Sequence, residues 1–155
     1  MLVDEDIVKL TLPEGRQAKE HLGKFYVGSA EQSFYQLIKD GFVPKGNYMM
    51  LTPCQRDEDI DEGHLEIFLK LELVSVTKTH QNIAQDVFDF YTKMGEKVEV
   101  VSSNYSRGCD LEIGGIEVGS FGSRMFGDYC VSYGTGLALP RFTQARQYKP
   151  IDNLK

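Results

Sequence analysis

Hydrophobic residues recur at helical spacing in two stretches of the chain. Over residues 30–39 the apolar positions follow the i, i+4, i+7, i+8 pattern of an amphipathic helix, and Gly41 lies just beyond it. A second stretch of this kind covers about residues 81–94 and is followed by Gly95. Because a glycine after the last periodic residue is a common helix stop, the pattern predicts a helix over each stretch. A third, shorter helix is predicted to begin near Pro140, since proline suits the first turn of a helix.

Six further stretches have the short apolar runs or the two-residue alternation that are typical of strands. They cover residues 48–52, 65–76, 97–102, 110–113, 116–120 and 129–133. The polar segment 53–63 predicts a long hairpin between the first two strands, and Gly114-Gly115 predicts a tight hairpin between the fourth and fifth. Strands joined by hairpins, with helices inserted between them, predict an α+β fold in which a mostly antiparallel sheet is flanked by helices.

Length and composition narrow the class of protein. The chain has 155 residues, of which 41% are hydrophobic, so we expect residues 1–155 to form a single domain with its own core. A net charge of −6 removes the overall attraction that non-specific binding to nucleic acid or anionic membranes requires. The acidic N-terminus does not resemble a signal peptide, and no apolar run is long enough for a membrane span. We expect a soluble cytoplasmic protein, without a membrane partner.

The strand predicted over residues 65–76 separates its side chains into two faces. The leucine-rich face is the predicted core side, and the other face is charged apart from Phe68. An aromatic ring in a charged row can stack on a flat heterocycle, or it can simply lie under a loop or a crossing helix. The leucine-rich face consists of Leu65, Ile67, Leu69, Leu71 and Leu73, and the charged face of Glu66, Phe68, Lys70 and Glu72.

Three other groups of residues are candidates for binding an anion or a cation. Arg56, flanked by acids, can bind a phosphate or be a solvated surface arginine. Carboxylates of the Gly114-Gly115 hairpin, Glu112 and Glu117 among them, can hold Mg²⁺ or be ordinary surface charge. The glycines at 134 and 136, followed by Arg141, can present backbone N–H groups and a guanidinium to an anion. A glycine-rich turn alone is a weak signal.

Five short motifs, in order along the chain, together resemble the catalytic core of class II aminoacyl-tRNA synthetases, with the seryl type as the closest subgroup. The motifs occupy residues 25–32, 52–58, 68–72, 116–120 and 134–141. The resemblance covers most of the chain, from about Phe25 to Gln147. It implies the α+β fold of that class, ATP and Mg²⁺ as cofactors, and an amino acid as the second substrate.

The resemblance also implies a role for each matching residue. Arg56 would bind the α-phosphate of ATP and Arg141 the γ-phosphate, as the catalytic residues. Glu58 would contact the adenine amino group, Phe68 would stack on adenine, and Gly136 belongs to the same nucleotide motif. Metal and substrate positions complete the implied site, with Glu117, Ser120 and the less certain Glu112 holding Mg²⁺, and Ser29 and Glu31 holding the ammonium group of the amino acid.

The matched positions leave a simpler interpretation of Ser29 open. The sequence Ser29-x-x-Gln32 fits a capping box, in which Ser29 caps the helix over residues 30–39 and the Gln32 side chain reaches back to the backbone N–H of Ser29. Helix capping and substrate binding are therefore alternative roles for this serine.

Three departures from the family pattern bear on function. Residues 1–24 hold no match to motif 1, which builds the family's dimer, so the resemblance is to a truncated core. Gln55 and Ile67 replace, in turn, an aromatic residue and a polar one. The acidic segment 57–66 should repel a tRNA phosphate backbone, so we do not expect tRNA binding by this chain alone.

Two functional hypotheses follow from these observations. In the first, the chain binds ATP·Mg²⁺ and activates an amino acid as its adenylate without charging tRNA alone. In the second, it keeps the synthetase fold without the reaction and acts as a regulatory or interaction module that forms a homodimer or binds a protein partner. An exposed apolar surface would favour the second hypothesis, because a missing element leaves a patch that a partner can cover.

Overall fold

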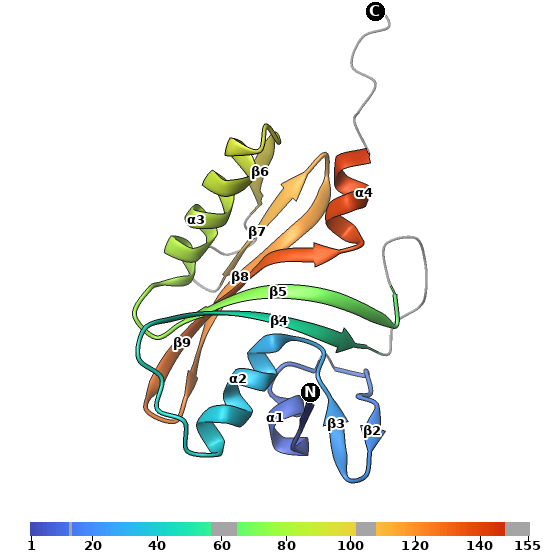
Figure 1. Cartoon of the computed structure of the whole chain (residues 1–155), viewed down its shortest axis with the longest axis vertical. Coiled ribbons are helices and arrows are strands. Elements are labelled where there is room, and N and C mark those ends of the chain that lie inside the picture. Colours follow the sequence, from blue (N-terminus) through green and yellow to red (C-terminus); the bar gives the residue numbers. More distant parts are fainter. Residues whose placement is uncertain (13, 57–64, 102–107, 148–155) are drawn as a thin grey trace, which may run out of the picture.

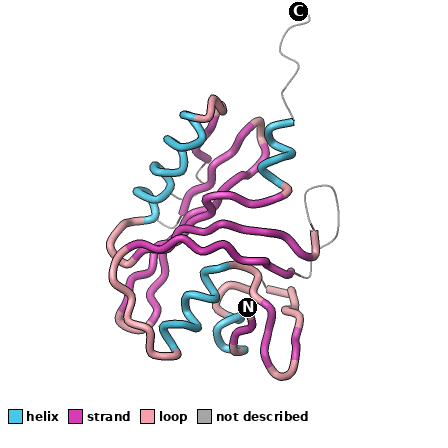
Figure 2. The backbone as a smooth tube through the Cα atoms, in the orientation of Figure 1, coloured by secondary structure: helices cyan, strands magenta, loops and turns pink. Residues whose placement is uncertain are grey.

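A computed structural model describes residues 1–12, 14–56, 65–101 and 108–147 of the chain. Its main feature is a six-stranded sheet, which makes up most of the magenta tube in Figure 2. The strand order is β4-β5-β9-β8-β7-β6, and every neighbouring pair is antiparallel. This sheet, flanked by helices, confirms the predicted α+β class. The strands are β4 (Asn47–Gln55), β5 (Ile67–Ser75), β6 (Val98–Val101), β7 (Gly108–Ile113), β8 (Ile116–Phe126) and β9 (Tyr129–Leu139).

Helices cover different parts of the two faces of this sheet (Figure 1). One face carries α3 (His80–Lys93), which packs on β7, β8 and β9, and α4 (Arg141–Gln147), which packs on β8 and β9. The other face carries α2 (Ala30–Lys39), which packs on β4 and β5. Beside α2 lie α1 (Glu5–Lys9) and a small sheet of β1 (Leu2–Val3), β3 (Lys24–Tyr26) and β2 (Glu20–His21) in that order.

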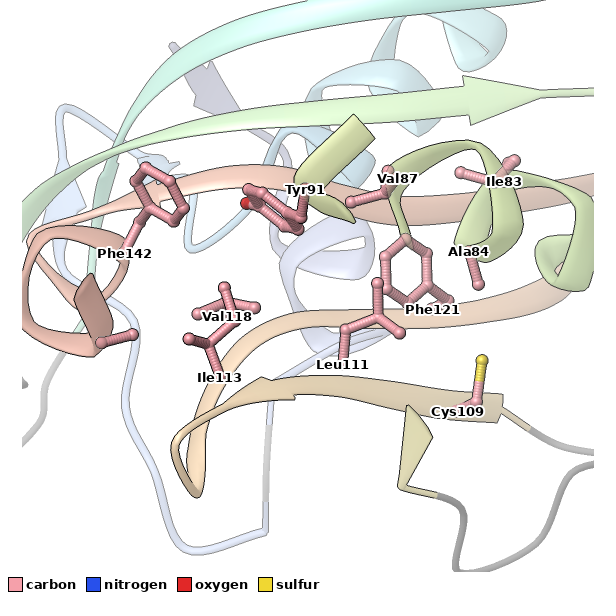
Figure 3. Close-up of a cluster of buried hydrophobic side chains, with 11 residues drawn as sticks. Ile83, Ala84, Val87, Tyr91, Cys109, Leu111, Ile113, Val118, Phe121 and Phe142 are labelled. Atoms are coloured by element: carbon pink, nitrogen blue, oxygen red, sulfur yellow. The ribbon is translucent and has the colours of Figure 1, made fainter. Parts of the chain in front are cut away.

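Two hydrophobic cores lie on opposite faces of the six-stranded sheet. The first fills the space under α3 and α4, where the rings of Tyr91 and Phe142 stack with centroids 5.0 Å apart (Figure 3). Phe121 of β8 belongs to it, and a Cβ at Gly134 of β9 would overlap the Phe121 ring, so only glycine fits there. The second core lies between the sheet and the α1–α2 layer and includes Phe34, Tyr35 and other apolar residues of both layers.

The predicted helices are confirmed, and most predicted strands are confirmed with longer boundaries. Thr79 caps α3 through a full capping box, in which its hydroxyl accepts from the backbone N–H of Asn82. The strand predicted over 129–133 continues to Leu139, so the segment Gly134-Thr135-Gly136 is not a turn. Two close glycines are typical of a turn, which is why the pattern predicts one here. In the structure, Gly134 instead makes room for the Phe121 ring and Gly136 forms a β-bulge. The elements before Ala30 were not predicted, since they are too short for a periodic pattern to emerge.

One face prediction for β5 is only partly correct. Leu71 and Leu73 are half-buried, but Ile67 and Leu69 are 62% and 39% exposed on the face predicted to be core. On the neighbouring edge strand β4, Met49 and Leu51 are 69% and 62% exposed on the same side. Helices α3 and α4 cover this side of the sheet only over the strands further along it. Met49, Leu51, Ile67 and Leu69 therefore form an uncovered apolar surface, which we call the β4–β5 patch.

Candidate functional site

A cleft of about 390 Å³ opens on the α1–α2 face of the sheet, where that layer leaves part of β5, β8 and β9 bare. Residues from both ends of the chain line it, from Val8 to Arg141. Each of the five sequence motifs contributes at least one residue to the lining of this cleft. The predicted site residues that line the cleft are Ser29, Glu31, Arg56, Phe68, Glu117, Ser120 and Arg141.

The remaining predicted positions do not line the cleft or lie outside the described residues. Gly136 is buried in β9, where it is the extra residue of a bulge opposite Leu71 and Glu72, and its carbonyl accepts a 2.7 Å hydrogen bond from Tyr91. Its place in a nucleotide motif is implied by the resemblance to synthetases and stays a prediction. Glu112 pairs with Glu117 across β7 and β8 but is not among the lining residues. Glu58 and the acidic segment around it lie outside the described residues.

Arg56 directly follows β4 and is held at the mouth of the cleft by several contacts. Its backbone N–H donates to the carbonyl of Glu66 at 3.0 Å, which extends the β4–β5 ladder by one pair. Its Nε donates to the carbonyl of Gly28 at 2.9 Å, and its guanidinium lies 5.2 Å from the centroid of the Phe68 ring. Gly28 leaves room for this stem, because a Cβ there would lie 3.3 Å from two Arg56 atoms. The cation and the ring thus face the cleft together.

Arg141 begins α4 on the opposite side of the cleft, next to the predicted metal position. Its Nη1 lies 3.2 Å from Oε1 of Glu117, and both side chains are partly exposed. In the described part of the chain, no three His, Cys, Asp or Glu side chains are grouped to hold a metal by themselves. Mg²⁺ usually takes one or two carboxylates and completes its shell with water and substrate phosphates, so Glu117 and Ser120 suit it as partial ligands.

Two buried carboxylates form the floor of the cleft. Glu31 is 5% exposed and accepts a 2.6 Å hydrogen bond from the hydroxyl of Tyr35. Burial, which disfavours the charged form, raises the pKa of Glu31 to about 7. Glu72 is 2% exposed, pairs with Nζ of Lys70 at 2.8 Å and accepts from the backbone N–H of Ala30. Two carboxylates at this depth are suited to a cationic group of a ligand.

Ser29 precedes α2 but does not cap it through its side chain. The amide oxygen of Gln32 accepts from the backbone N–H of Gly28 at 2.7 Å, and its nitrogen donates to Oγ1 of Thr11 at 2.6 Å. The capping box is therefore absent. The Ser29 hydroxyl is buried and has no hydrogen-bond partner among the described residues, although it lines the cleft. Ser29 therefore does not have the capping role, and its role in ligand binding stays a prediction.

Several cleft residues were missed at the level of sequence. Glu72 and Lys70 lie on the same face of β5 as Phe68, so the alternation that singled out the ring already placed them beside it. Arg124 of β8 and Arg16 of the segment between α1 and β2 carried no local signal. The contact of Arg124 with the carbonyl of Leu10 joins residues 114 positions apart, which no local pattern reveals.

The balance of charge in the cleft differs from that of the whole chain. Among the described lining residues, the basic side chains number five and the acidic ones three. The chain as a whole has a net charge of −6. A local excess of cations beside buried carboxylates suits a ligand pair with anionic phosphates and an ammonium group. The five cations are Arg16, Arg56, Lys70, Arg124 and Arg141.

Among the described helices, none has both the length and the apolar character needed to cross a membrane. Comparison with known sequences identifies no relative, since no family model and no curated protein matches the chain.

Solved structures, in contrast, match almost the whole chain. The structure of Desulfitobacterium hafniense PylSc, a pyrrolysyl tRNA synthetase, superposes with a TM-score of 0.66 at 18% identity, and covers 94% of this chain and 60% of its own. A second pyrrolysyl-tRNA synthetase structure from the same organism gives a TM-score of 0.64 at 16% identity, with 94% and 61% covered. Seryl-tRNA synthetase from Pyrococcus horikoshii, complexed with ATP, gives 0.66 at 14% identity, with 94% and 44% covered.

The chain thus spans less than two thirds of each of these synthetases. Equal TM-scores for a pyrrolysyl and a seryl enzyme leave the seryl-type subgroup a prediction. Identities of 14 to 18% establish the fold and nothing finer. On this evidence the protein has the α+β fold of the class II aminoacyl-tRNA synthetases.

Proposed function

We propose that the cleft binds ATP·Mg²⁺ and an amino acid and joins them as an aminoacyl-adenylate. The single observation that carries the proposal is the convergence of Arg56, Phe68, Arg141 and Glu31 on one cleft. Their residue types suit the parts of the two substrates: guanidinium groups for phosphates, a ring for adenine and a buried carboxylate for an ammonium group.

The proposed reaction needs no protein nucleophile. A carboxylate oxygen of the amino acid attacks the α-phosphorus of ATP, the bond from that phosphorus to the bridging oxygen breaks, and pyrophosphate leaves with the electron pair. Glu31 and Ser29 hold the amino acid, while Arg56 neutralises charge that develops on the α-phosphate. Arg141 binds the terminal phosphate, and Glu117 with Ser120 would hold Mg²⁺, which neutralises phosphate charge when bound.

Removing the Arg141 guanidinium should weaken ATP·Mg²⁺ binding. A charge-assisted hydrogen bond contributes about 1.5 to 3 kcal/mol, so Arg141→Ala is expected to raise the dissociation constant about tenfold to a hundredfold. Isothermal titration calorimetry measures it directly. The matched control is Arg146→Ala, because Arg146 also lies on α4, pairs with Glu96 at 2.7 Å and contacts a phenylalanine ring, but does not line the cleft. Equal affinities for the two variants would contradict the assignment of Arg141.

We do not propose that this chain charges tRNA by itself. The acidic segment 57–64 carries the wrong charge to attract a phosphate backbone.

A second candidate function, an interaction module, is favoured by the β4–β5 patch. We propose a second copy of this chain as its occupant. β4 is an outermost strand of the sheet, so a two-fold axis beside it would pair the two edges and join the two patches into one face. A stable interface buries about 800 Å² of surface on each partner. The four side chains of the patch supply less than this, so pairing of the two β4 edges has to contribute the rest.

Disrupting the β4–β5 patch should dissociate this dimer. We expect sedimentation velocity at micromolar concentrations to show a dimer for the wild-type chain and a monomer for Leu51→Glu. Met125→Glu is the matched control, because Met125 is 63% exposed on β8, away from the patch. An interface of about 8 kcal/mol corresponds to a dissociation constant of about 1 μM. A wild-type chain that stays monomeric up to about 100 μM would therefore contradict the second-copy proposal.

A further inference from the structure

Arg124 of β8 lines the cleft and contacts two segments that precede the six-stranded sheet in the sequence. Its Nη1 donates a hydrogen bond to the carbonyl of Leu10, just after α1. Its Nε lies 3.7 Å from Oε1 of Glu31, at the start of α2. The Arg124 side chain is a third exposed, whereas Glu31 is buried. One guanidinium therefore connects the sheet, the N-terminal segment and the buried carboxylate.

We propose that Arg124 is a positioning residue that keeps the Glu31 carboxylate ionised and in place for the ammonium group of the amino acid. The inference deepens the proposed function and rests on it, because it assigns Glu31 the same ligand. Arg124 itself contacts no reacting atom in this scheme.

The surroundings of Glu31 show why it needs such a partner. Burial and the neighbouring carboxylate of Glu72 on β5 both oppose its charged form. The Tyr35 hydroxyl on α2 and the Lys70 ammonium on β5 favour the charged form, but Lys70 already pairs with Glu72 at 2.8 Å. Tyr133 on β9, whose pKa burial raises, faces the same space as a neutral group. Arg124 is the cation that makes an ion pair with Glu31 in the described part of the chain.

The contact with Leu10 fixes Arg124 from the opposite side. Gln32, one residue after Glu31, donates to Oγ1 of Thr11 and to the carbonyl of Val8. The segment from Val8 to Leu12 is therefore held by α2 and by Arg124 together, and its residues Val8, Thr11 and Leu12 line the same cleft as Glu31. A guanidinium held at both ends cannot swing away from the carboxylate, so its charge acts on Glu31 from a fixed place.

The test is an NMR titration of the Glu31 side-chain carboxyl carbon in the full-length chain. In the wild type we expect a midpoint near pH 7. Because an opposite charge at this distance lowers a carboxyl pKa by a unit or more, Arg124→Gln should raise the midpoint by about one unit. Arg124→Lys, which keeps the charge, should restore most of this shift. The matched control Arg146→Gln, outside the cleft, should leave the midpoint unchanged.

A folded Arg124→Gln variant with the wild-type midpoint would overturn the proposal. If Arg124→Gln does not fold, the double variant Glu31→Gln/Arg124→Gln decides, because it removes the unpaired buried carboxylate as well. Recovery of folding in the double variant supports the proposal. If the double variant also fails to fold, Arg124 stabilises the chain through its hydrogen bond to Leu10 and not through Glu31. That result would contradict the proposal.

Kinetics give a second readout that a purely structural role would not produce. With its Glu31 midpoint one unit higher, Arg124→Gln should raise the KM for the amino acid about fivefold at pH 7, and the difference should nearly vanish by pH 9. A KM increase that is the same at both pH values would contradict the proposal. The two proposals fail separately: if the wild type activates no amino acid but the Glu31 midpoint still responds to Arg124, only the proposed function is lost.

Discussion

Replacing Arg56 with alanine is expected to lower amino-acid-dependent ATP–pyrophosphate exchange about a hundredfold, because a positioned cation at the developing phosphate charge contributes about 2.7 to 4 kcal/mol to a transition state. The structure holds this guanidinium in place before any ligand binds, through the carbonyl of Gly28 and the ring of Phe68. The loss should appear mainly in kcat, since the charge develops as pyrophosphate leaves. Arg56→Lys should recover only part of the rate, because an ammonium group lacks the planar fork.

Arg146→Ala is again the matched control for this experiment. Arg146 also lies over a phenylalanine ring, with its guanidinium carbon 5.8 Å from the centroid of Phe142. Unlike Arg56, it does not line the cleft. Thermal unfolding of both variants separates a lost charge from a lost fold. An Arg56→Ala variant that is folded and exchanges pyrophosphate at the rate of Arg146→Ala would show that Arg56 does not act on the phosphate.

Glu31→Gln should have opposite effects on function and on stability. A neutral amide loses the ionic bond to the substrate ammonium, which we expect to lower amino-acid-dependent exchange about a hundredfold. The pKa of Glu31 is about 7 in the folded chain and 4.5 ordinarily, so the folded state binds the extra proton between these values. Glu31 therefore makes the wild-type chain less stable as pH rises from about 4.5 to 7, and the loss persists above pH 7.

Glutamine removes this ionisation, and its amide oxygen can still accept from Tyr35. Above pH 7 the variant should be more stable than the wild type by on the order of 2 kcal/mol, and the difference should disappear near pH 4. Urea unfolding at pH 4, 6 and 8 measures it. Glu99→Gln, at an exposed site on β6, should change nothing at any of the three pH values. Equal stability of Glu31→Gln and wild type at pH 8 would mean that burial of the carboxylate costs nothing.

Local periodicity was sufficient for the long elements and for part of the site. The apolar patterns of α2, α3, β4 and β5 predicted these elements, and the alternation along β5 placed Phe68 on the face that lines the cleft. Arg56 and Arg141, which lie at the ends of elements, followed from short motifs at those ends. These features depend on neighbours along the chain, which is why sequence alone predicted them.

The mistakes came from contacts between distant residues. Gly134 and Gly136 have the composition of a turn, but Gly134 makes room for Phe121 and Gly136 forms a bulge opposite β5. Ile67 and Leu69 have the alternation of core residues, yet α3 and α4 lie over other strands and leave them exposed. No periodic pattern states whether a helix lies above a given strand.

Three-dimensional contacts also exclude one of the two roles that the sequence left open for Ser29, the capping of α2, and its role in substrate binding stays a prediction. The motif fits a capping box, but Gln32 binds Gly28 and Thr11 instead, and the serine hydroxyl stays available inside the cleft. The roles of Arg124 and of the segment after α1 were likewise beyond sequence reasoning, because Arg124 and Leu10 are 114 positions apart in the chain.

The central claim is that the cleft activates an amino acid with ATP. The most direct test is ATP–pyrophosphate exchange by the purified full-length chain with Mg²⁺, carried out with each amino acid in turn, alongside calorimetric titration of ATP·Mg²⁺. We predict saturable ATP binding, and exchange that depends on one amino acid or a small group of them and needs higher ATP concentrations in Arg141→Ala. A correctly folded chain that shows neither binding nor exchange with any amino acid would contradict the claim.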